Sequence, residues 1–138
     1  MKLYVREPGT DEVLRLASRT ANHRLAILAL SKVEFRSAIR KRQRARDLDE
    51  DAASGVLARF ERHVETRYVC QILSESVLDT AACLIDRHIL RAYDSIQLAG
   101  CLALRDTSGD SQPTFVCADR DLLRAAEIEG LNVLDPAR

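Results

Sequence analysis

Short apolar runs of strand length alternate with longer helical patterns along this chain. The runs lie at residues 25–30, 68–73, 114–117 and 132–134. The helical patterns lie at residues 10–19, 31–46, 49–65, 74–88, 92–105 and 119–129. Because parallel strands need a crossover between them, this alternation predicts an α/β fold with a mainly parallel sheet and helices on both faces. The sequence shows no internal repeat and no domain boundary, so residues 1–138 are predicted to form one domain.

The composition is that of an ordinary globular protein, with 46% apolar and 30% charged residues. The formal net charge is zero, so no global field favours nucleic acid or a membrane, and any polyanion must bind to a local patch. No apolar stretch approaches the roughly 18 residues of a membrane span. We therefore predict a cytoplasmic protein with no membrane partner.

Cysteines and histidines are scattered through the sequence without the spacing of metal ligands. They are Cys70, Cys83, Cys101, Cys117, His23, His63 and His88. The cysteines lie in apolar surroundings, which is typical of reduced core thiols in a cytosolic protein. The pattern therefore argues against a zinc site.

Three carboxylates, Glu34, Asp94 and Asp119, each lie in or at the predicted first turn of a helix. Glu34 and Asp119 directly follow predicted strands, and ligand sites of open α/β sheets form where strands end and the next helices begin. Acids gathered there would repel one another unless a cation bound them. Mg²⁺ and Mn²⁺ take oxygen ligands and activate water in phosphodiester cleavage. The pattern predicts a divalent metal site.

Each acid also has a purely structural explanation. Ser31 and Glu34 form a capping-box pattern, in which the glutamate accepts a backbone N–H at the helix start. The helix dipole favours Asp94 in a first turn, and Asp119 is a natural N-cap after its strand. At the level of sequence both explanations stay open. Further helix start and stop signals are Thr10, Ser74 and Gly130.

The predicted helix at residues 31–46 is rich in arginine. Arg36, Arg40 and Arg44 recur at a spacing of four and therefore share one face. This face is a candidate for binding an RNA backbone, with the steep salt dependence of phosphate contacts. The alternative is a solvated face that pairs with nearby acids. These acids are Asp47, Asp49, Glu50 and Asp51.

Four segments in order resemble the PIN-domain family, and within it the VapC-type toxins of bacterial type II toxin–antitoxin pairs. The segments are KLYVREPGTDEV, ALSKVEFRSAIRK, LRAYDSIQLAGCLAL and FVCADRDLLRAAEIEGLNVLDP. The last three carry Glu34, Asp94 and Asp119 where the family has metal-binding acids. The resemblance implies a three-layer α/β/α fold and a Mg²⁺- or Mn²⁺-dependent ribonuclease. It also implies a cognate antitoxin and a homodimer.

The chain departs from the family in two places. It begins within the family's first helix, so the preceding central strand, with a further metal-binding aspartate, has no counterpart here. We expect the true start codon upstream, because several lost core side chains at ~1.5–3 kcal/mol each rival the ~5–15 kcal/mol stability of a domain. Cys117 stands where the family often has Thr or Ser, and this is expected to weaken support of the acids.

Three functions compete at this point. The first is a metal-dependent endoribonuclease in which Glu34, Asp94 and Asp119 are both metal ligands and catalytic residues. The second is a catalytically inactive PIN-like remnant that binds an antitoxin-like partner or RNA. The third, a structural interaction protein, rests only on the apolar helices. Mg²⁺ and Mn²⁺ accept the same oxygen ligands, so the pattern fits either ion.

Overall fold

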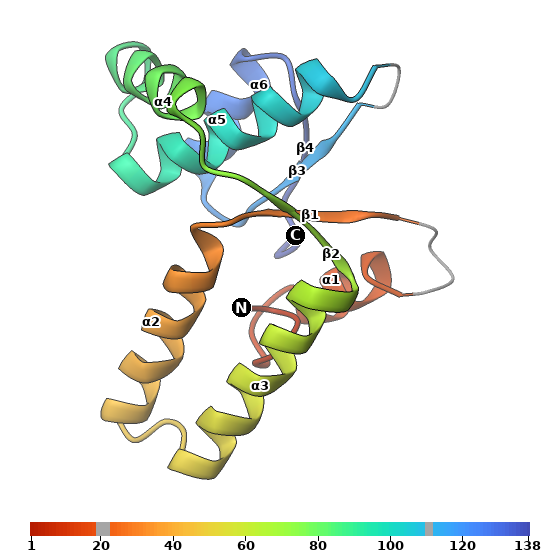
Figure 1. Ribbon diagram of the computed structural model, residues 1–138, viewed down its shortest axis with the longest axis vertical. Helices are drawn as coiled ribbons and strands as arrows, with labels where there is room; N and C mark the ends of the chain where they lie inside the picture. The colour runs from red at the N-terminus through yellow and green to blue at the C-terminus, as the bar shows by residue number, and fades with distance from the viewer. Residues whose placement is uncertain (19–22, 110–111) are drawn as a thin grey trace. The chain divides into compact units, whose positions relative to one another are not determined.

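The computed structural model describes residues 1–18, 23–109 and 112–138, which divide into two compact units, Met1–Gln71 and Ile72–Arg138 (Figure 1). These residues form six helices and four short strands. The strands pair in parallel, which confirms a mixed α/β fold. They form two separate two-stranded pairs, so one three-layer sheet in a single domain stays a prediction. No helix in the described ranges has the length and apolarity that crossing a bilayer requires.

The first unit contains three helices and one strand pair. Its elements are α1 (Thr10–Leu16), β1 (Leu25–Leu28), α2 (Ser31–Arg44), α3 (Glu50–Thr66) and β2 (Tyr68–Gln71). Leu25 lies opposite Tyr68, and Leu28 lies opposite Gln71 in the parallel pair. The crossover from β1 to β2 consists of α2 and α3, which pack side by side (Figure 1).

Aromatic rings join α2, α3 and the N-terminal segment. Phe35 stacks on Phe60 with ring centroids 4.1 Å apart, and Tyr4 packs edge-on against them at 5.0 and 5.5 Å. Such ring pairs contribute about 0.5–1.5 kcal/mol each beyond their buried area. Ala53 and Leu57 of α3 are buried in the same cluster. This core fixes which face of α3 points away from α2.

The N-cap predicted at Thr10 is wrong. Gly9 occupies the cap of α1 with a φ of 86°, a left-handed conformation that glycine adopts at no steric cost. The Thr10 hydroxyl instead accepts the N–H of Glu7 at 2.9 Å and closes the preceding turn. The predicted end of this helix, residue 19, lies outside the described residues. Ser74 is the N-cap of the next unit's first helix, as predicted, and accepts the N–H of Val77.

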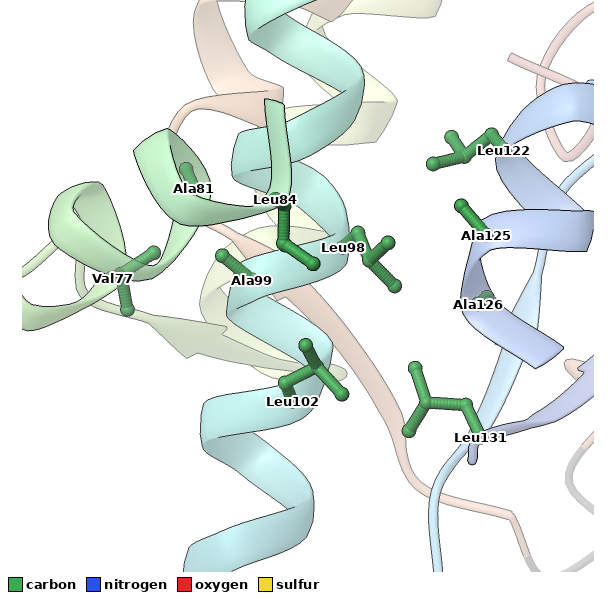
Figure 2. Close-up of a cluster of buried hydrophobic side chains, with 10 residues drawn as sticks. All are labelled: Val77, Ala81, Leu84, Leu98, Ala99, Leu102, Leu122, Ala125, Ala126 and Leu131. Atoms are coloured by element: carbon green, nitrogen blue, oxygen red, sulfur yellow. The ribbon is translucent and has the colours of Figure 1, made fainter. Parts of the chain in front are cut away.

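The second unit is built around one central helix. Its elements are α4 (Glu75–Arg87), α5 (Ala92–Thr107), β3 (Thr114–Val116), α6 (Arg120–Ile128) and β4 (Asn132–Leu134). Side chains from α4, α5 and α6 form its core, as Figure 2 shows. Leu84 of α4 and Leu98 of α5 are both 0% exposed. The crossover α6 connects β3 to β4, so its first residues lie at the end of a parallel strand.

Polar contacts fix the C-terminal end of α6. His88 Nε2 lies 2.7 Å from Glu129 Oε1, and Arg105 Nη1 donates to the Glu129 carbonyl at 2.8 Å. Gly130 follows with a φ of 82° and ends the helix, as predicted. Because one end of α6 is held in this way, the position of Asp119 at its other end is also constrained.

All four cysteines are free thiols. Cys70, Cys101 and Cys117 are half-buried. Cys83 is exposed, so the prediction of a core thiol is wrong there. The reason is the helical period, because α4 buries the adjacent Leu84 and turns Cys83 toward solvent.

Candidate functional site

Asp94 lies in the first turn of α5, as predicted, and is half-buried. Burial raises the pKa of Asp94, and the negative charge of Asp119 raises it further. The positive charge of Arg91, the residue that precedes α5, lowers it. A charge effect of this kind requires proximity. Within the second unit, the charge of Asp119 at the start of α6 thus reaches Asp94 in the first turn of α5.

Asp119 is the N-cap of α6, which confirms the structural explanation for this residue. Its Oδ1 accepts the N–H of Asp121 at 3.0 Å and the N–H of Leu122 at 3.1 Å. Both bonds use the same oxygen. The cap therefore orients the carboxylate through Oδ1, and the second oxygen, Oδ2, takes no part in these two bonds.

Cys117 follows β3 and supports the backbone of this site. Its Sγ accepts the N–H of Asp119 at 3.3 Å. Burial raises the pKa of the Cys117 thiol, the Asp119 N–H opposes this, and the charges of Asp119 and Asp94 add to the rise. The thiol is therefore neutral at neutral pH. A neutral sulfur is a weak acceptor, which agrees with the weakened support expected from the sequence.

Glu34 lies in the first turn of α2, as predicted, and belongs to the first unit. The capping box predicted with Ser31 as N-cap is wrong in its register. Leu30 is the N-cap in a helical conformation, and its carbonyl accepts the N–H of Glu34 at 3.2 Å. Ala29 similarly accepts from Lys32, so backbone carbonyls satisfy the first amides of the helix. The role of Glu34 as a metal ligand stays a prediction.

The donor set of the Asp94–Asp119 pair fits a hard divalent cation. Carboxylate oxygens are the ligands that Mg²⁺ prefers, and it is commonly held by one or two carboxylates together with water and substrate phosphates. In the described part of the chain no three His, Cys, Asp or Glu side chains are grouped as a metal site. Of the three predicted acids, Asp94 and Asp119 lie in the second unit, where the charge of Asp119 acts on Asp94, and Glu34 lies in the first unit.

The arginines of α2 are partly engaged within the first unit. Arg36 forms an ion pair with Glu61 of α3. Arg40 Nη1 donates to Gln43 Oε1 at 2.6 Å, and Arg44 is exposed. Among the described residues no ion pair joins these three arginines to the acids at residues 47–51, so the alternative of a solvated face paired with those acids gains no support. RNA binding by this face stays a prediction.

Sequence reasoning missed Arg91. This residue is exposed, and its charge acts directly on Asp94. The signal in the sequence was its position three residues before Asp94, a spacing that brings two side chains together at a helix start. A guanidinium beside paired carboxylates is positioned to bind an anionic substrate that the cation also binds.

The effect of the Asp119 charge on Asp94 gives a direct test of the pair. In Asp119→Asn the negative charge that raises the pKa of Asp94 is removed, so the Asp94 carboxyl should titrate at lower pH than in the wild type. Carboxyl carbon chemical shifts followed by NMR against pH would measure this. Asp121→Asn is the matched control, because Asp121 is exposed and not among the groups acting on Asp94. Equal Asp94 titration in the wild type and Asp119→Asn would contradict the pair.

Scans against protein-family models and against curated proteins gave no match for this chain.

Proposed function

We propose that this protein is a Mg²⁺- or Mn²⁺-dependent endoribonuclease of PIN-like fold, with Asp94 and Asp119 as ligands of the cation. The observation that carries the proposal is the charge effect between two carboxylates of different helices, one of them half-buried. Keeping two like charges close together costs free energy that a divalent cation would recover. A cation held at such a site polarises a phosphoryl oxygen and activates water.

The surrounding residues have distinct tasks in this proposal. The bonds from the α6 amides to Asp119 Oδ1 hold that carboxylate in one orientation. Cys117 holds the Asp119 backbone through its sulfur. Arg91 binds a non-bridging oxygen of the scissile phosphate and so positions the RNA backbone next to the acids. Asp94 completes the ligand set from α5.

The resemblance to the PIN-domain family supports the same reaction. It adds Glu34 of α2 as a third acid, a three-layer α/β/α arrangement, a homodimer and a cognate antitoxin in the cytoplasm as further parts of the proposal. The second candidate is an inactive remnant that binds RNA or an antitoxin-like partner, and it is favoured because no group of three His, Cys, Asp or Glu side chains is found among the described residues.

Metal removal separates the two candidates. With a labelled RNA, the full chain should cleave when Mg²⁺ or Mn²⁺ is present and stop in EDTA, because the cation activates the attacking water. Either ion should also raise the Tm of the wild type, because it binds only the folded state. This Tm rise should be absent in Asp94→Asn. Cleavage that persists in EDTA would contradict the proposal, and RNA binding without cleavage would support the remnant.

A further inference from the structure

The C-terminal half of α3 separates its charges onto two sides. Glu61 and Glu65 line a groove of about 190 Å³ between α2 and α3, where Glu61 pairs with Arg36. Arg59 and Arg62 do not line this groove. Residues 59, 62 and 63 follow at intervals of three and four, so they share a face of the helix. Glu61 and Glu65 therefore lie on the α2 side of the helix, and Arg59 and His63 lie away from it. Arg62 is three residues from Glu65 but forms no ion pair with it within the described part of the chain.

The other side of α3 is strongly positive. Arg59, Arg62 and Arg67 are exposed, and none of the three forms an ion pair with a described residue. Burial lowers the pKa of His63, and the charges of Arg67, Arg59 and Arg62 lower it further. Three guanidinium groups thus act on one imidazole, and no carboxylate is among the groups that do so. The groups acting on His63 thus form a local cluster of positive charge.

Two of these side chains are held in place by contacts with other parts of the first unit. Tyr4 Oη lies 2.7 Å from His63 Nδ1 and 2.5 Å from Tyr68 Oη. When Tyr68 donates to Tyr4 and Tyr4 donates to Nδ1, the neutral imidazole carries its proton on Nε2. Arg67 Nη2 donates to the carbonyl of Ala17 at 2.8 Å. Donors fixed in this way lose less conformational entropy on binding an anion.

We propose that Arg59, Arg62, His63 and Arg67, named here the α3 basic surface, bind the phosphate backbone of RNA. The inference rests on the proposed ribonuclease function and assigns a substrate-binding surface to it. Guanidinium groups match phosphate oxygens in a bidentate geometry. The nearby rings of Tyr4, Phe60 and Tyr68 are packed among themselves and against Phe35, so they offer no platform for stacking bases. Binding is therefore to the backbone and independent of sequence.

The arginine face of α2 is the competing surface. There, Arg36 is neutralised by Glu61, and Arg40 is engaged with Gln43. Arg59 and Arg62 are exposed and carry no such partner among the described residues. Arg44 of α2 is exposed as well, but two of the three α2 arginines are already engaged. Within the described residues, α3 therefore offers more unpaired guanidinium groups than this face of α2 for releasing counterions from a polyanion.

Fluorescence anisotropy with a short labelled oligouridylate tests this surface. The full chain is titrated in EDTA, so that binding is measured without cleavage, across about 50 to 200 mM salt. The double variant Arg59→Gln/Arg62→Gln should bind the oligouridylate at least about tenfold more weakly at the lowest salt. The slope of log K against log salt should become smaller in magnitude by about 1.4, which is about 0.7 for each lost phosphate contact. Arg36→Gln/Arg44→Gln removes the same charge from exposed positions and should change binding much less.

Each outcome supports or overturns the proposal that the α3 basic surface binds RNA. A loss of RNA affinity confined to the α3 variant supports the proposal, whether or not the protein cleaves RNA. Failure of the nuclease proposal would be seen separately, in the cleavage assay with and without metal. A loss confined to the α2 variant, or equal losses in both, overturns it. Labelled polyglutamate is the probe for an acidic protein partner. Tight polyglutamate binding that the α3 variant loses, with no RNA binding by the wild type, also overturns it.

Discussion

Asp119→Asn is expected to lose at least about a hundredfold of Mg²⁺-dependent RNA cleavage with nearly unchanged stability. A catalytic cation supplies several kcal/mol of transition-state stabilisation, and each 1.4 kcal/mol is about tenfold in rate. Asparagine lacks the negative charge that holds the cation. It nevertheless caps helices about as well as aspartate, so the bonds to the N–H groups of Asp121 and Leu122 can be kept. Single-turnover cleavage and urea unfolding would measure the two quantities.

Two further variants separate the capping role from the ligand role. Asp119→Ala removes both and should also lower the free energy of unfolding by about 0.5–2 kcal/mol, the usual value of an N-cap. Asp121→Asn makes the same charge change two residues away on an exposed side chain and should leave cleavage near the wild-type rate. If Asp119→Asn cleaved as fast as the wild type, only the capping role of this residue would survive.

Leu84→Ala is expected to lower the free energy of unfolding by about 2–5 kcal/mol, the range measured for buried leucines that leave a cavity. Leu84 is 0% exposed and lies between α4 and α5, facing Leu98, in the core of the second unit (Figure 2). A close-packed core relaxes only partly into the vacated volume, so most of the lost contacts are not replaced. Urea unfolding followed by circular dichroism would measure the change.

The adjacent Ile85 gives the matched control. This side chain is on the same helix but is 44% exposed, so Ile85→Ala should change the free energy of unfolding by no more than about 0.5 kcal/mol. Similar losses in both variants would show that α4 does not bury the Leu84 face described here.

Features set by neighbouring residues could be predicted from the sequence. Ser74 and Asp119 cap their helices and Gly130 ends α6 as expected, because a cap is a contact between residues two or three apart. The predicted N-caps were wrong where the same residue could form either a cap or another local hydrogen bond. The Thr10 hydroxyl closes a turn instead of capping the helix. Ser31 is the first residue of α2 and not its N-cap, which is Leu30.

The charge partners of the arginines were not predictable in the same way. Arg36 reaches Glu61 on another helix, although several acids lie nearer to it in the sequence. Aromatic packing between α2 and α3 decides this, because it sets which sides of the two helices face one another. The same packing leaves Arg59 and Arg62 outside the groove that Glu61 and Glu65 line, which residue order does not reveal.

The sequence by itself determined that this protein alternates helices with short parallel strands, and that Asp94 and Asp119 each stand at a helix start. Periodicity and capping depend on residues that are close together in the sequence, so both can be predicted from the order of the residues. Only the tertiary structure decided that the charge of Asp119 acts on Asp94. That proximity depends on how α5 and α6 pack around Leu98, because it is packing that sets the distance between charges on different helices.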